Sequence, residues 1–177
     1  MKPNIIGIVG GVIAFISLAL PWWTMTAFGT SGVSFSGGVS IYPYLATAAA
    51  EGLSLEVTID IWYGWAALVL VVMGGLLGIV GSLVRSTRLI LVAGGLLALL
   101  SIIIFAVGLQ SELSKSPLVS GWPVVALFSS DSRFMGYLNY TAYLSFGFWL
   151  ALVSAIIMLV SSRRKLEVRA SPPQLPT

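Results

Sequence analysis

The sequence predicts an all-α transmembrane four-helix bundle with a small extracellular antiparallel β-sheet, formed mainly by the first outer loop. Three observations lead to this fold class. Only 8% of the 177 residues are charged and the mean hydropathy is +1.01, whereas a soluble domain has about 25% charged residues. Four long runs contain no Asp, Glu, Lys or Arg. Between the first two runs, apolar and polar residues alternate, as they do in strands with one buried face.

The four uncharged runs predict four membrane spans. They cover residues 4–23, 61–84, 89–109 and 142–162. Each supplies the roughly 20 apolar residues that cross the hydrocarbon core as a helix. The first run follows Lys2 in the manner of a signal peptide, and we interpret it as a retained span. Residues 1–162 then form a single tetraspan membrane domain with outer loops at 24–60 and 110–141, followed by a cytoplasmic basic, Pro-rich tail at 163–177.

The charge distribution predicts the orientation of these spans. Seven of the nine basic residues fall on one side of the predicted membrane: Lys2, Arg85, Arg88, Arg163, Arg164, Lys165 and Arg169. Five of the six acidic residues fall on the other side: Glu51, Glu56, Asp60, Glu112 and Asp131. Basic residues accumulate in cytoplasmic loops, so we expect a multi-pass cell-membrane protein with both termini cytoplasmic. The net charge of +3 then reports topology and contact with membrane lipids, and not binding to nucleic acid.

The first outer loop carries the strand signals. Val33, Phe35, Val39 and Ile41 alternate with serines around Gly37-Gly38, a pattern typical of a β-hairpin with a Gly-Gly turn. An alanine-rich connection, 46–50, precedes a second alternating segment, 53–60, and a shorter strand is expected at 23–27. The predicted sheet has one apolar face, shielded by the bilayer surface, the second loop or a partner. A flexible Ser/Gly linker is the alternative.

The second outer loop is less regular. The run 124–128 fits an extra strand or a segment lying on the membrane, and 129–133 is typical of a turn. Asn139-Tyr140-Thr141 fits the N-glycosylation pattern, but its closeness to the fourth span predicts poor access. Aromatic residues flank the spans, among them Trp22, Trp23, Trp62, Tyr63 and Trp65, and we interpret them as an interfacial belt in preference to an aromatic or quinone-like ligand site.

Small residues recur every four positions in the predicted spans. Such stripes allow close helix contact in lipid, where burial of apolar surface supplies no drive for association. Gly7 and Gly11, Gly74 and Gly78, and Gly94 and Ala98 are expected to pack within the bundle. The stripe of Gly147, Ala151 and Ala155 is assigned to a partner.

The chain lacks the residue types that most catalytic and metal sites use. The chain has no histidine and no cysteine, so the commonest general base, haem and zinc ligands and thiolate sites are missing from it. No ionisable residue lies inside a predicted span, where proton relays and ion-coupled carriers usually place one. The outer acids match no calcium motif. We therefore predict no catalytic, metal or cofactor site, and a protein that is not an enzyme.

The order of these features resembles the claudin-type tetraspan proteins. Four spans, two cytoplasmic ends, a long strand-rich first outer loop, the short inner loop 85–88 and a second outer loop match that architecture along the whole chain. The resemblance implies an outer sheet on a left-handed four-helix bundle, and assembly side by side and between membranes. It is one of topology: the family's loop signature of Trp, Gly-Leu-Trp and two cysteines does not occur, so no functional residue is carried over.

These observations predict a non-enzymatic assembly protein: a scaffold, an adhesion-like element or an accessory subunit of a membrane complex. Its partners would be other membrane protein subunits or further copies of itself. The residues predicted to make these contacts are Val33, Phe35, Val39, Ile41, Trp122, Gly147, Ala151 and Ala155. Two alternatives remain open. One is a small channel or transporter for a neutral solute, with a path lined by Ser17, Ser101, Ser145 and Ser154. The other is a lipid- or quinone-handling membrane enzyme subunit.

Overall fold

The computed structural model describes residues 4–29, 36–50, 53–56, 61–84, 88–115, 129–134 and 138–170 of the chain. Within these residues lie four helices, α1 (Ile5–Leu18), α2 (Trp62–Leu83), α3 (Arg88–Lys115) and α4 (Phe146–Ala170). The strands are β1 (Trp23–Gly29), β2 (Ser36–Ile41), β3 (Ala46–Ala50), β4 (Leu53–Glu56), β5 (Ser129–Phe134) and β6 (Leu138–Leu144). The prediction of four helices with an antiparallel sheet is confirmed at this level.

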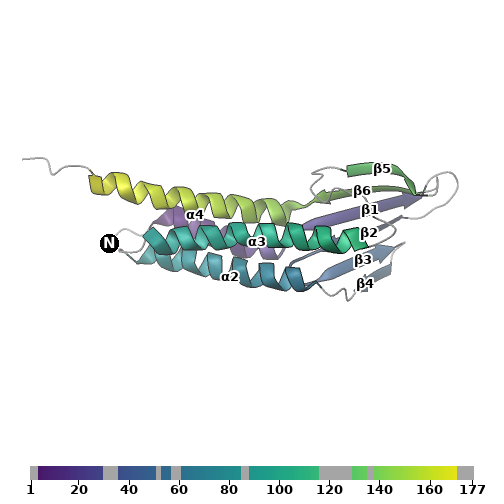
Figure 1. Ribbon diagram of the computed structural model, residues 1–177, viewed down its shortest axis with the longest axis horizontal. Coiled ribbons are helices and arrows are strands. Elements are labelled where there is room, and N and C mark those ends of the chain that lie inside the picture. The colour runs from purple at the N-terminus through teal and green to yellow at the C-terminus, as the bar shows by residue number, and fades with distance from the viewer. Residues whose placement is uncertain are drawn as a thin grey trace, which may run out of the picture.

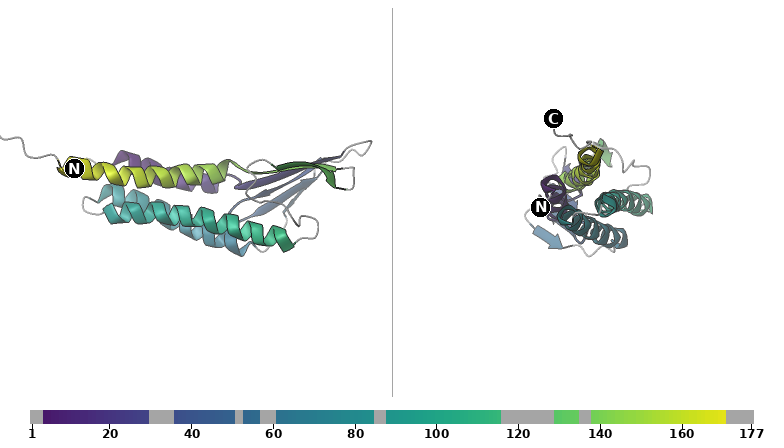
Figure 2. Two further views of the ribbon diagram at one scale, coloured as in Figure 1. Left: turned by 45° about the horizontal axis from the view of Figure 1, so that its top comes forward. Right: turned by 90° about the vertical axis from the view of Figure 1, so that its left-hand side faces the viewer.

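The molecule is elongated, with the helices at one end and the sheet at the other (Figure 1). α1 packs against α2 and α4, and α3 packs against the same two helices. The four helices therefore form a closed ring, which is seen nearly end-on in the right-hand view of Figure 2. Among the described residues, two helical segments, Trp62–Leu83 and Leu89–Glu112, are long and apolar enough to cross a membrane. The apolar helical segments Ile5–Leu18 and Phe146–Ser162 are shorter.

Three of these helices, α1, α3 and α4, have ends that differ from the predicted spans. α1 begins after its N-cap Asn4, whose side chain accepts a hydrogen bond from the Gly7 amide, and it ends before Pro21, which has no amide hydrogen to donate. α2 agrees with the prediction to within one residue at each end. α3 runs six residues beyond its predicted end, and α4 begins four residues late and continues through 163–170, which were assigned to the tail.

The sheet draws strands from both predicted outer loops. Its order is β4-β3-β2-β1-β6-β5, and each of the five pairings is antiparallel. Four strands come from the first loop, as predicted, and the second loop adds β5 and β6 beside β1. β1 is the next element after α1, and β6 is the element before α4. The neighbouring strands β1 and β6 therefore connect the sheet to this pair of helices.

Three local predictions in the loops are wrong. Gly37-Gly38 is not a turn but lies inside β2, where Gly38 pairs with Thr26 on one side and Ala49 on the other. A Cβ on Gly38 would lie 3.1 Å from the Met25 carbonyl oxygen, so close strand approach explains this glycine. The alanine connection is strand β3, and the expected turn at 129–133 is edge strand β5. The run 124–128 lies outside the described residues.

Candidate functional site

The strand register gives the sheet two chemically different faces. Directly paired residues of an antiparallel sheet lie on the same face, and successive residues alternate between faces. One face, here called the apolar face, carries Trp23, Met25, Ala27, Val39, Ile41, Ala46, Ala48, Ala142 and Leu144. The other, the polar face, carries Thr24, Thr26, Phe28, Ser36, Ser40, Thr47, Thr141 and Tyr143.

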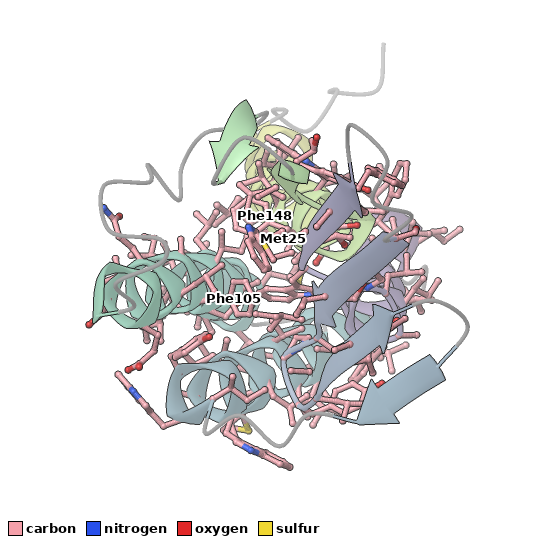
Figure 3. The ribbon with its side chains drawn as sticks, turned by 90° about the vertical axis from the view of Figure 1, so that its right-hand side faces the viewer. Met25, Phe105 and Phe148 are labelled. Atoms are coloured by element: carbon pink, nitrogen blue, oxygen red, sulfur yellow. The ribbon has the colours of Figure 1, made fainter. Side chains whose placement is uncertain are left out.

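The apolar face closes the sheet-side end of the helical ring. Its first row, Trp23, Ile41 and Ala46, is buried. Met25 and Val39, one row further from the helices, are half-buried and pack against the same core. Figure 3 shows Met25 beside Phe148 of α4, with Phe105 of α3 close by. The helices therefore cover the near part of this face.

The polar face is open. Ser36 is exposed, Phe28 is 52% exposed, and Thr24, Thr26 and Ser40 are half-buried. Hydroxyls dominate, and none of its residues named above is charged. The result is a broad surface rich in hydroxyl groups, which the register continues to Glu56 of β4 opposite Thr47, with one exposed aromatic ring at the end far from the helices.

Trp22 joins the sheet to the helices. It is fully buried, and its Nε1 donates to the Ser17 carbonyl oxygen of α1 at 2.9 Å. Its backbone amide donates to the Ile41 carbonyl, and its carbonyl accepts from the Ser145 amide at the start of α4. Its ring meets Phe105 edge-on with the ring centroids 5.0 Å apart. The backbone and side chain of this one residue thus join β1 to α1, α3 and α4.

The aromatic belt is only partly as predicted. Trp62 and Trp65, at the start of α2, are exposed at the junction of helices and sheet, where an interfacial belt would lie. Trp22, Trp23 and Tyr63 are instead buried. These three rings belong to the core, so their assignment to the belt is wrong.

The predicted contact residues are divided between the core and the sheet. Val39 and Ile41 lie on the apolar face, half-buried and buried respectively. Gly147, Ala151 and Ala155 are buried inside the helical ring, so a partner has no access to this stripe in the single chain. Val33, Phe35 and Trp122 lie outside the described residues. The polar face was missed as a surface, although the alternation of Thr24 and Thr26 with apolar neighbours was its signal.

No protein-family model matches this chain, and no curated protein matches it significantly in sequence. Within the described ranges, no group of three or more His, Cys, Asp or Glu residues is placed to hold a metal ion.

The helices have an inverted distribution of side chains. Their outward positions carry large apolar side chains on all four helices: Ile5, Val9, Val12, Ile16, Val69, Met73, Leu76, Val80, Leu96, Leu100, Ile103, Val107, Val153, Ile156 and Val160 are exposed. Their inward positions carry mainly glycine, alanine and serine, including Gly11, Gly75, Ala98, Ser101 and Ala155. A water-soluble helix has its large apolar residues on the inward side.

The small inward residues bring the helix backbones together. A Cβ on Gly74 of α2 would lie 2.8 Å from the Gly94 carbonyl oxygen of α3, and a Cβ on Gly11 of α1 would lie 2.7 Å from the Gly75 carbonyl oxygen of α2. At Gly74 and Gly11 the neighbouring helix therefore leaves no room for a side chain larger than the glycine hydrogen. The prediction that these stripes pack within the chain is confirmed.

Most of the buried serine hydroxyls donate a hydrogen bond to a carbonyl oxygen of their own helix. The hydroxyls of Ser17 and Ser101 donate to the carbonyl oxygens three residues earlier, Ala14 and Ala98, at 2.6 and 2.7 Å. This back-bonding within a helix is the usual solution for serine away from water. The Ser154 hydroxyl is buried and has no hydrogen-bond partner.

Proposed function

We propose that this chain is an integral membrane protein with four spans and cytoplasmic termini, and that it acts non-enzymatically in assembly. The observation that carries the proposal is the inverted helical ring joined to a sheet with an open polar face. In this reading the ring lies in the bilayer and the sheet projects on the extracellular side, in a claudin-like tetraspan arrangement. The role is that of a scaffold, an adhesion-like element or an accessory subunit.

The outward side chains support immersion in lipid. Large aliphatic groups facing water on every helix would form an apolar surface far beyond the few hundred Å² usual for soluble monomers, whereas lipid tails solvate them without cost. The 22 residues of α2 extend about 33 Å, enough to cross a hydrocarbon core of about 30 Å. α1 and α4 have shorter apolar segments, but both are packed against α2 or α3 and would enter the bilayer with them.

The polar face supports assembly through the sheet. It is broad and rich in hydroxyl groups, and its Ser and Thr side chains can each donate and accept hydrogen bonds. Such a surface suits contact with another protein surface, because a typical protein–protein interface contains about ten direct hydrogen bonds. The row nearest the helices contains Thr24, Ser40, Thr47 and Tyr143 and continues to Glu56 of β4. We expect this row to face neighbouring subunits in the same membrane.

The serines make a solute path the weaker alternative. Ser17 and Ser101 donate their hydroxyl hydrogens to carbonyls of their own helices, so these two serines can offer a passing solute only acceptor lone pairs, whereas the Ser154 hydroxyl keeps its donor. The glycine contacts between α1, α2 and α3 also favour a closely packed ring. A transporter of neutral solutes would then need a path between subunits.

The proposed topology predicts opposite labelling of two single cysteines. The natural chain has no cysteine, so Ser36→Cys on the exposed end of β2 and Ser171→Cys in the tail each create a single reporter. In intact cells, a membrane-impermeant maleimide should label the variant at position 36 and spare the variant at 171 until the membrane is permeabilised. Labelling of both, or of 171 alone, would contradict the orientation.

Charge on the polar face should weaken association. Thr24→Lys combined with Ser40→Lys places two like charges in the row nearest the helices, and burying them against a partner is unfavourable. In mild detergent, we expect the mass of the native complex to fall toward that of a monomer by light scattering. Because Thr24 and Ser40 are directly paired, repulsion between the two lysines should cost about 0.2–1 kcal/mol, so the thermal midpoint should fall by only a few degrees. Gln110→Lys, at an exposed site of α3, is the matched control. A natural chain that is already a lone monomer would refute the assembly proposal.

A further inference from the structure

The sequence contains a single Asn-x-Ser/Thr pattern, Asn139-Tyr140-Thr141. The structure places it in β6, where Asn139 pairs with Phe28 of β1 and Thr141 pairs with Thr26. By register, Asn139 therefore belongs to the same row as Phe28 and Ser36, at the exposed end of the polar face. This placement differs from the sequence-based expectation that the pattern lies against the fourth span.

The pattern lies well away from the helices. Asn139 lies six positions before Ser145, which precedes α4, and at about 3.3 Å per residue this separation is roughly 20 Å. The neighbouring pair, Gly29 with Leu138, is the last pair of the β1–β6 ladder. In the proposed topology, Asn139 is thus at the end of the sheet farthest from the bilayer.

The surroundings leave space for a bulky group. Phe28, opposite Asn139, is 52% exposed, and Ser36, opposite Phe28 on β2, is exposed as well. On the other side of β6, the pairing with β5 is irregular between Asp131 and Phe134, and bulges of this kind locally open a ladder. An exposed aromatic ring beside a sugar can also cover its apolar C–H face.

We propose that Asn139 is the acceptor of an N-linked glycan on the far end of the polar face. The side-chain amide nitrogen would attack the anomeric carbon of a lipid-diphosphate-linked oligosaccharide in a membrane oligosaccharyltransferase. The C–N bond forms as the anomeric C–O bond to the diphosphate breaks, the lipid diphosphate leaves, and the nitrogen loses one proton to a base of the transferase. Thr141 completes the recognised pattern.

This assignment rests on the proposed topology, because only the extracellular side meets the transferase. It is also compatible with the proposed assembly surface. Thr24 and Tyr143 lie four residues along their strands from Phe28 and Asn139, about 13 Å away. A glycan at the far end would leave this row beside the helices free for a neighbouring subunit.

Translation into microsomes that contain an oligosaccharyltransferase tests the assignment. The natural chain should give one band of higher mass that an endoglycosidase returns to the unmodified position. Asn139→Gln and Thr141→Ala should abolish the shift, and Thr141→Ser, which preserves the pattern, should retain it. Because the sequence has no second pattern, residual modification of Asn139→Gln would overturn the assignment.

Two control variants separate this proposal from the topology on which it rests. Gly32→Asn creates the pattern in the predicted first outer loop, and Arg169→Asn creates it at the cytoplasmic end of α4. If Gly32→Asn adds a second glycan and Arg169→Asn adds none, orientation and acceptor both stand. A natural chain left unmodified while Gly32→Asn is modified defeats the Asn139 assignment alone. Modification of Arg169→Asn but not of Gly32→Asn defeats the topology.

Discussion

Replacing Gly94 with leucine is expected to destroy the packing of α2 against α3. A Cβ on Gly94 would lie 2.7 Å from the Gly74 carbonyl oxygen and 3.0 Å from the Gly78 amide nitrogen. Both obstacles are backbone atoms of α2, so no side chain can rotate away and the helices must separate. We expect a loss of about 3 kcal/mol or more in the free energy of unfolding, measured by reversible denaturation in mixed detergent micelles.

Two further variants calibrate this result. Gly94→Ala adds only the Cβ and should fall between the natural chain and Gly94→Leu. Val80→Leu also adds volume to this helix pair, but Val80 of α2 is 45% exposed on the outward surface, so its stability should change by less than about 0.5 kcal/mol. Equal stability of Gly94→Leu and Val80→Leu would mean that α2 and α3 do not approach through these glycines.

The helices could be predicted from sequence because their signal is local. Absence of charge over more than twenty residues identified α2 almost to the residue. The first span was overextended because residues 19–23 are nearly as apolar as the helix before them, and only Pro21 signalled its end. Residues 142–144 were assigned to a span for the same reason, although their backbone completes β6.

The sheet was harder to predict because its stability is not local. Gly37-Gly38 carries a turn signal, yet pairing with β1 and β3 on both sides outweighs it. Alanine has a low preference for strands, but β3 is paired along both edges and its Ala46 is buried. The contribution of β6 beside β1 joins residues more than a hundred positions apart, which no short pattern reveals.

The contact residues predicted from sequence were chosen for their apolar character. Apolar strand residues such as Val39 and Ile41 suggested recognition, but the chain's own helices and neighbouring strands cover much of that face. Hydropathy alone does not separate large apolar side chains that face outward, such as Val80, from those that pack inside the chain, such as Ile41. The same ambiguity placed Trp22 in the interfacial belt, whereas the structure places it in the core.

Trp22→Ala is expected to loosen the sheet from the helices. The variant removes a fully buried indole, its 2.9 Å hydrogen bond to Ser17 and its edge-on contacts with Phe105 and Phe148. Loss of a buried Trp costs about 3–5 kcal/mol. Trp22→Phe keeps a ring but loses the hydrogen bond and leaves the Ser17 carbonyl without this donor, so it should cost about 1–3 kcal/mol.

A reporter on the apolar face distinguishes loosening of the sheet from general unfolding. Met25→Cys places the only thiol of the chain one row above the buried junction, where the natural packing should slow its labelling by maleimide. Adding Trp22→Ala should speed that labelling at least tenfold under conditions in which the helical circular dichroism is unchanged. Trp62→Ala, which removes a ring that is 58% exposed, should leave the labelling rate as it was. If both tryptophan variants changed the rate equally, Trp22 would not be the joint between the sheet and the helices.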